Sequence, residues 1–187
     1  MTAGELLRRV VEALEAADIP YMVVGSFAST WHGAPRTTQD IDIVIDPTPA
    51  GLDRFLEDLD RDDLYVSPSA RQTLETRDQF NVIHPAGGWK VDLVIRKERA
   101  FSRQELARRT HARLLDVDTY AATAEDTILS KLEWAAAGGS DRQINDAAAV
   151  LDVSRSTVDE RYLDRWAEEL GITDLLARAR ALTERGR

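Results

Sequence analysis

Hydrophobic residues recur with two different periods along the chain, and the change of period separates an N-terminal from a C-terminal region. Up to about residue 115, short aliphatic runs with strand-like alternation are interspersed with helical patterns. From Thr123 onward the apolar residues recur at helical spacing. The pattern therefore predicts an α/β (α+β) protein, with a small mixed sheet flanked by helices over residues 1–115 and a helical region over residues 116–187 packed on that core.

The individual elements follow from the same periodicity and from turn residues. Thr2 and Glu5 have the spacing of a capping box, and Ser26, Ser102 and Ser140 are expected to cap the helices that follow them. The segments 80–84 and 89–95 are expected to pair as a hairpin. The predicted helices cover residues 2–17, 27–32, 52–59, 70–77, 102–109, 124–137, 142–151, 158–170 and 173–182, and the predicted strands cover residues 21–24, 38–45, 80–84, 89–95 and 113–117.

Two carboxylates interrupt the aliphatic strand over residues 38–45. Side chains alternate between the two faces of a strand, so Asp40, Asp42 and Val44 share one face while three isoleucines share the other. A charge that loses water needs a partner, which makes two acids in such a strand costly. A divalent cation is a natural partner for both.

A third carboxylate, Asp92, stands in a later strand with the same alternation, where Lys90, Asp92 and Val94 share a face. Carboxylate oxygens are the ligands that Mg²⁺ prefers, and bound phosphates and waters commonly complete its shell. A lone aspartate would be interpreted as a solvated strand residue. The Asp-x-Asp pair together with a third strand aspartate instead predicts a site for Mg²⁺, with Mn²⁺ as the alternative, held by Asp40, Asp42 and Asp92.

A Gly25-Ser26 turn precedes this strand, with 13 residues between Ser26 and Asp40. Glycine allows a ligand to approach the backbone closely, and the amides at a helix start together with a serine hydroxyl can hold a phosphate. By itself the dipeptide is also compatible with an ordinary turn and helix cap. Arg36, in the loop before Asp40, is a further candidate for a phosphate contact.

The order of these motifs resembles the nucleotidyltransferase superfamily that includes DNA polymerase beta. The resemblance covers roughly residues 20–96 and rests on Gly25-Ser26, on Asp40-Ile41-Asp42 and on Lys90-Val91-Asp92. It implies that Asp40 and Asp42 hold the metal ions that bind a nucleoside triphosphate, and that Asp92 binds a metal on the acceptor side. Gly25 and Ser26 would hold the outer phosphates.

The segment from Ala124 to Trp134 and the Ser140-Asp141-Arg142-Gln143 stretch resemble a bacterial branch related to abortive-infection toxins. In those toxins a helix lysine and a later Arg/Asp motif complete the site. Lys131 matches the lysine, and it would offset charge on the triphosphate; it is alternatively a solvated lysine on an amphipathic helix. Arg142 and Asp146 match the later motif loosely, since the family's Arg-Asp pair is here Asn145-Asp146, and their spacing also fits an ion pair on a helix surface.

The resemblance implies transfer of a nucleoside monophosphate from an NTP to a hydroxyl of a protein, an RNA end or a small molecule. The alternative is a non-catalytic module of the same fold that acts in a toxin–antitoxin or regulatory pair. A metal-dependent phosphohydrolase is disfavoured because the three histidines show no metal-ligand spacing. A homodimer or an antitoxin-like protein partner is compatible with the Ala- and Leu-rich C-terminal helices.

Composition excludes some classes of partner, metal site and cellular location. The formal charge of −9 disfavours general affinity for nucleic-acid backbone, and the lack of cysteine excludes disulfides and thiolate metal sites. No apolar run is long enough to span a membrane, and the N-terminal segment reads as an amphipathic helix rather than a signal peptide. A cytoplasmic location is therefore expected.

Overall fold

The computed structural model describes residues 1–34, 38–59 and 64–185, which form two compact units. One unit contains the described residues among 1–27 and 38–121. The other contains residues 28–34 and 122–185.

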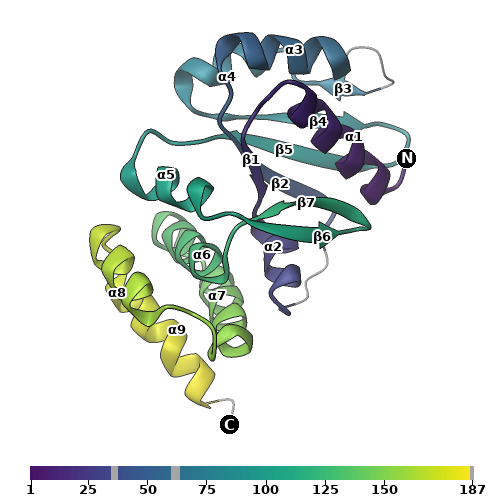
Figure 1. Cartoon of the computed structure of the whole chain (residues 1–187). Coiled ribbons are helices and arrows are strands. Elements are labelled where there is room, and N and C mark those ends of the chain that lie inside the picture. Colours follow the sequence, from purple (N-terminus) through teal and green to yellow (C-terminus); the bar gives the residue numbers. More distant parts are fainter. Residues whose placement is uncertain (35–37, 60–63, 186–187) are drawn as a thin grey trace. The chain divides into compact units, whose positions relative to one another are not determined.

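The first unit is built on a mixed sheet with strand order β3-β4-β5-β2-β1-β7-β6 (Figure 1). The central strand β2 pairs in parallel with β5 and antiparallel with β1, and β1 pairs in parallel with β7. The strands found in the described residues are β1 (Tyr21–Val23), β2 (Asp40–Ile45), β3 (Tyr65–Val66), β4 (Gln79–His84), β5 (Trp89–Ile95), β6 (Thr110–Leu114) and β7 (Val117–Ala121).

The alternation in β2 and β5 sorts their side chains onto two faces as predicted. The three isoleucines of β2 and their apolar neighbours in β5 are fully buried in the core, where helices α1 (Ala3–Ala16) and α3 (Pro49–Leu59) also pack. Burial of one such aliphatic side chain contributes about 2 kcal/mol. The apolar face thus holds the unit together, and Asp40 and Asp42 are left on the opposite face.

The remaining helices of this unit are short. Helix α4 (Ala70–Thr76) follows the edge strand β3, and α5 (Ala100–Ala107) follows β5. Helix α2 (Gly25–Trp31) directly follows β1, and only its first three residues belong to this unit. The predicted capping box is confirmed at α1, where the Thr2 hydroxyl accepts a hydrogen bond from the Glu5 amide.

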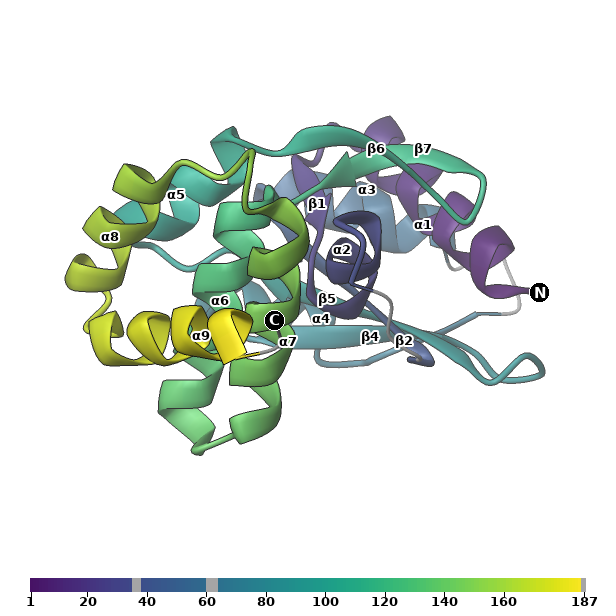
Figure 2. The same ribbon diagram turned by 90° about the horizontal axis from the view of Figure 1, so that it is seen from below.

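The second unit is helical, as predicted for the C-terminal region. It contains α6 (Ala124–Gly138), α7 (Asp141–Ser154), α8 (Glu160–Glu169) and α9 (Thr173–Arg185). Figure 2 shows α6 and α7 side by side, and their buried faces include Ile128, Leu132, Ile144 and Leu151. The Tyr162 hydroxyl donates to Asp126 at 2.6 Å, which ties α8 to the first turn of α6.

Several local predictions were wrong. The single extended segment 113–117 is instead the turn of a hairpin, in which β6 and β7 are joined by Leu115 and Asp116. Both residues have positive φ, at 50° and 61°, as a type I′ turn requires. Asp116 suits such a turn but Leu115 does not, so the hairpin carries no strong sequence signal.

Two of the three predicted serine caps were also wrong. Helix α5 begins two residues before Ser102, and α2 begins at Gly25, so both serines lie inside their helices. Ser140 does occupy the cap position of α7, but its side chain makes no capping hydrogen bond. The division at residue 115/116 stays a prediction, although β7 continues the sheet to Ala121.

None of the helices in the described parts of the chain combines the length and the apolar character needed to cross a membrane.

Candidate active site

The structure brings the three predicted aspartates together on one face of the sheet. Strands β2 and β5 run parallel and in register, so that Asp42 lies opposite Asp92 and Asp40 lies opposite Lys90. Neighbouring strands are about 4.8 Å apart, and residues in register point to the same face. Three carboxylates and one ammonium group therefore share a small area on adjacent strands.

Lys90 contacts two of these carboxylates. Its Nζ lies 2.8 Å from Asp92 Oδ2 and 3.7 Å from Asp40 Oδ1. The hydrogen bond to Asp92, together with the charges of Asp92, Asp40 and Asp42, raises the pKa of Lys90 against the opposing effect of its partial burial. Lys90 is thus a firmly charged member of the cluster.

Asn81 of β4 holds the other oxygen of Asp92. It lies opposite Asp92 in the antiparallel pair, and its side-chain amide donates a hydrogen bond to Asp92 Oδ1. The backbone amide of Asn81 in turn donates to the Ser67 hydroxyl at 3.1 Å. Because Asn81 and Lys90 each bind a different oxygen, the buried Asp92 carboxylate has a defined orientation.

Gly25 lies against Asp42. The backbone of Gly25 has φ of +63°, and a Cβ placed on it would be 2.2 Å from Asp42 Oδ2 and 3.2 Å from Asp42 Cβ. Only glycine satisfies both requirements without strain. Gly25 therefore permits the close approach of the turn after β1 to the carboxylate of β2.

Ser26 follows in the first turn of α2 and is buried. It belongs to the same unit as Asp42, so the structure keeps the Gly25-Ser26 turn and the acidic face together. Arg36, the other predicted phosphate contact, lies outside the described residues.

The oxygen donors of this site can be compared with those that a divalent cation prefers. Three carboxylates on one face, with Gly25 allowing backbone to reach Asp42, match the hard oxygen donors that Mg²⁺ requires. In the arrangement described, Lys90 is bound to two of them. Within the described residues, no group of three or more His, Asp or Glu side chains is gathered tightly enough to hold a metal ion. The metal site stays a prediction.

Lys131 lies in the second unit, on α6, and is buried. Its Nζ is 3.3 Å from Asp146 Oδ2 on α7, so two of the three residues singled out in the C-terminal region pair with each other. Among the described residues, no ion pair joins Asp146 to Arg142, which is exposed one turn earlier. The suggested Arg142–Asp146 pair was wrong, and the role of Lys131 towards a nucleotide stays a prediction.

The opposite end of the β2–β5 pair carries a second charged cluster. Asp46 follows β2 and Arg96 follows β5, and their side chains are joined at 2.8 Å. Arg77 lies 3.7 Å from Asp46 and also pairs with Glu98, as does Arg96 at 3.7 Å. Two acids and two arginines thus face each other there.

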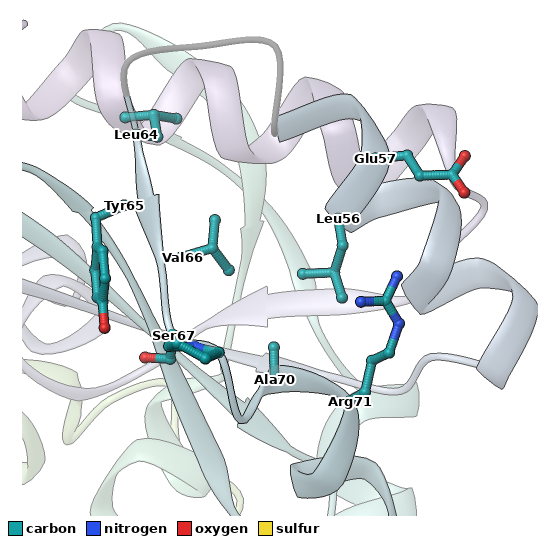
Figure 3. Close-up of a pocket in the computed structure, with 9 residues that line it drawn as sticks. Leu56, Glu57, Leu64, Tyr65, Val66, Ser67, Ala70 and Arg71 are labelled. Carbon is teal, nitrogen blue, oxygen red and sulfur yellow. The ribbon is translucent and has the colours of Figure 1, made fainter.

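A pocket of ≈ 460 Å³ is present elsewhere in the first unit, with side chains from α3, β3 and α4 around it (Figure 3). Its lining includes Leu56, Tyr65 and Arg71 and contains none of the predicted site residues. The pocket is therefore separate from the charged cluster on β2 and β5.

Sequence reasoning missed the contacts of Lys90 and Asn81. Lys90 was placed on the correct face but received no role, and Asn81 was not singled out. The signal available was a polar residue at alternating positions of β4 and β5, but only the register of the two strands shows that it meets Asp92.

The fold is similar to that of several nucleotidyltransferases of known structure. An antigenic nucleotidyltransferase-like protein from Paracoccidioides brasiliensis matches with a TM-score of 0.61 and 17% identity, over 94% of this chain and 86% of that protein. The antibiotic-resistance factor ANT(2'')-Ia matches in its solution structure with a TM-score of 0.55 and 14% identity, over 98% of this chain and 95% of the other. ANT(2'')-Ia has also been crystallised with adenylyl-2''-tobramycin.

The lincosamide antibiotic adenylyltransferase LnuA, with lincomycin bound, matches with a TM-score of 0.52 and 10% identity, over 80% of this chain and 96% of that one. No protein-family model matches the chain, and no curated protein is significantly similar to it. At these identities the similarities show a shared fold, which confirms the predicted fold class.

Proposed function

We propose that this chain is a metal-dependent nucleotidyltransferase that moves a nucleoside monophosphate from an NTP to an acceptor hydroxyl. The observation that carries the proposal is the register of β2 and β5, which sets Asp42 beside Asp92 and keeps Asp40 on the same face. Gly25 in contact with Asp42 supports it, because this glycine brings the turn after β1 to the carboxylates.

In this reaction the acceptor oxygen forms a bond to the α-phosphorus, and the bond from that phosphorus to the β-phosphate bridging oxygen breaks. The acceptor proton is lost and pyrophosphate leaves. Bound Mg²⁺ supplies charge neutralisation for the triphosphate and the leaving group. Asp40, Asp42 and Asp92 would hold it, and Asp92, whose orientation is fixed by Asn81, would help to take up the acceptor proton.

Phosphate binding is assigned to the turn beside the carboxylates. Gly25 and Ser26 would contact the outer phosphates, with Arg36 as a further contact. Lys131 would offset phosphate charge, and to do so it would have to share or leave the carboxylate of Asp146, which lies 3.3 Å away.

Two of the structural neighbours define which substrates should be tried first. LnuA is a lincosamide adenylyltransferase, and ANT(2'')-Ia has been crystallised with an adenylylated tobramycin. ATP and small polyhydroxylated compounds are therefore the first donor and acceptor class to test, ahead of RNA ends and protein hydroxyls.

The decisive experiment measures transfer of label from α-labelled ATP, and pyrophosphate release, with Mg²⁺ and panels of acceptors including a cell lysate. Asp42→Asn is expected to lower the rate by about 10³-fold, because it removes one charged metal ligand. The control is Asp116→Asn, which makes the same change in the β6–β7 turn at a positive-φ position that asparagine tolerates.

Equal rates for the wild type and Asp42→Asn would contradict the proposal, provided that both unfold at the same temperature. Binding of ATP with Mg²⁺ by calorimetry, without transfer to any acceptor, would instead support the non-catalytic module.

A further inference from the structure

We propose that Lys90 is the internal counter-ion of the acidic face formed by Asp40, Asp42 and Asp92, and that a divalent cation must displace it to bind there. The inference rests on the proposed function in that the same carboxylates are the metal ligands. It adds a residue that controls when the metal is taken up.

The geometry shows why a cation is needed at this position before any metal arrives. Asp42 and Asp92 are adjacent across two parallel strands, and Asp40 is on the same face. Like charges this close oppose one another, and Asp92 is largely removed from water, with 11% of its side chain exposed. An ammonium group in contact with Asp92 and Asp40 relieves both costs.

The position of Lys90 makes it a competitor for the same oxygens. Its Nζ contacts Asp92 Oδ2 at 2.8 Å, while Asp92 Oδ1 is occupied by the Asn81 amide. A metal ion that used Asp92 Oδ2 would therefore compete with the ammonium group of Lys90 for this oxygen. The Lys90 side chain is about one-third exposed, at 32%, so its ammonium group can leave towards solvent.

Displacement of Lys90 links metal uptake to nucleotide binding. A metal ion that binds without nucleotide is stabilised by the carboxylates, but the ammonium group of Lys90 then loses its ion pairs. A metal that arrives with a triphosphate supplies anionic oxygens with which the released ammonium can pair. The protein should accordingly bind metal weakly by itself and more tightly together with nucleotide, a positive coupling between the two ligands.

The test is a titration of the purified full chain with Mn²⁺ in the absence of nucleotide, followed by calorimetry. Lys90→Gln is expected to bind Mn²⁺ about tenfold more tightly than the wild type, because the ion no longer competes with an ammonium group for the carboxylates. Lys90→Arg keeps the charge and should stay within about threefold of the wild type. Lys97→Gln is the matched control, since Lys97 is exposed after the end of β5 and makes the same charge change.

Thermal unfolding supplies a second readout. Without metal, Lys90→Gln should melt about 3–6 °C below the wild type, because Asp92 loses a charged partner. Mn²⁺ should raise the melting temperature of this variant more than that of the wild type. If Lys90→Gln is unfolded without metal, Mn²⁺ is expected to restore its far-UV circular dichroism, and failure to do so overturns the inference.

The outcomes separate this inference from the proposed function. Tighter Mn²⁺ binding by Lys90→Gln without nucleotide transfer by any form of the protein upholds the counter-ion and refutes the transferase. Unchanged or weaker Mn²⁺ binding by Lys90→Gln overturns the counter-ion even if the wild type transfers nucleotides. Equal tightening in Lys97→Gln also overturns it, because the effect would then reflect net charge alone.

Discussion

The two ends of the β2–β5 strand pair both carry charged side chains, but in different ratios. After the strands end, Asp46 and Glu98 face Arg77 and Arg96, so acids and bases are equal in number. At the other end, three aspartates share one face with Lys90, which contacts Asp40 and Asp92. Among the described residues, the first cluster is balanced in charge, whereas the second holds three carboxylates and one ammonium group.

This difference separates a cluster that stabilises the fold from one that is suited to bind a cation. A balanced set of ion pairs has no electrostatic reason to recruit another ion, and its disruption affects mainly stability. An unbalanced acidic set gains from any cation that reaches it, so its disruption affects binding.

Gly25→Ala should disturb the acidic end most. The substitution imposes positive φ on alanine and pushes a methyl group against Asp42, so we expect a loss of about 3 kcal/mol in stability together with loss of Mn²⁺ binding. Gly139→Ala is the matched control because Gly139 has the same φ of +63° and no atom within 4 Å of an added Cβ. It should cost about 1 kcal/mol. If both variants lose the same free energy of unfolding in urea, the close approach of Gly25 to Asp42 does not contribute to stability.

Arg96→Met should disturb the balanced end. Arg96 is buried and lies 2.8 Å from Asp46, so its removal leaves a half-buried carboxylate with weaker pairing. We expect stability to fall by about 2 kcal/mol in urea unfolding, with Mn²⁺ affinity unchanged within about twofold. Arg103→Met, an exposed arginine on α5, should change stability by less than about 0.5 kcal/mol. A larger effect of Arg96→Met on metal affinity than on stability would show that the cluster around Asp46 also takes part in metal binding.

Asn81→Ala tests whether the orientation of Asp92 matters beyond its charge. Loss of the amide donor should cost about 1 kcal/mol in stability and weaken Mn²⁺ binding about tenfold, as is typical for residues that orient a metal ligand. Asn145→Ala on the exposed face of α7 serves as the control and should leave both quantities unchanged. A stability loss with unaltered metal affinity would restrict Asn81 to a structural role.

Glu5 is a carboxylate that belongs to neither end, and it provides the smallest and purely structural effect. Its hydrogen bonds from the Thr2 backbone and from the Thr2 side chain lower its pKa below the ordinary value of 4.5. A lowered pKa in the folded state means that the stabilisation is present above pH 4.5 and is lost as the pH falls through the folded value. The difference in melting temperature between wild type and Glu5→Gln should therefore be present at pH 7 and vanish in acid. A constant difference at all pH values would contradict this.

Much of the fold was predictable because its elements carry strong periodic signals. The alternation around Asp40 and Asp92 identified two strands and their faces, and Gly87-Gly88 marked the β4–β5 hairpin. The β6–β7 hairpin was missed because Leu115 and Asp116 adopt positive φ without the glycine or asparagine that usually announces it. The start of α5 was displaced because Ser102 hydrogen bonds with Arg99 from within the helix instead of capping it.

The candidate site was predictable only in part. Asp40, Asp42, Asp92 and Gly25 could be chosen from residue type and spacing, because each lies in a strand or turn with a clear pattern. The contacts of Lys90 and Asn81 depend on which strands are neighbours, and strand order is not contained in local periodicity. The same reason explains why Arg142 was suggested as the partner of Asp146, when the contact is made by Lys131 from another helix.

The in-register pairing of β2 and β5 also has a consequence for how the chain finds its native state. A slip of β2 by one residue would move Asp40 and Asp42 to the side occupied by the buried isoleucines and expose Ile41 and Ile43. Two carboxylates inserted among aliphatic side chains make every odd-numbered shift strongly unfavourable. Asp40 and Asp42 therefore also favour the native register of β2 during folding. Replacing both with apolar residues would make pairing in a shifted register less unfavourable.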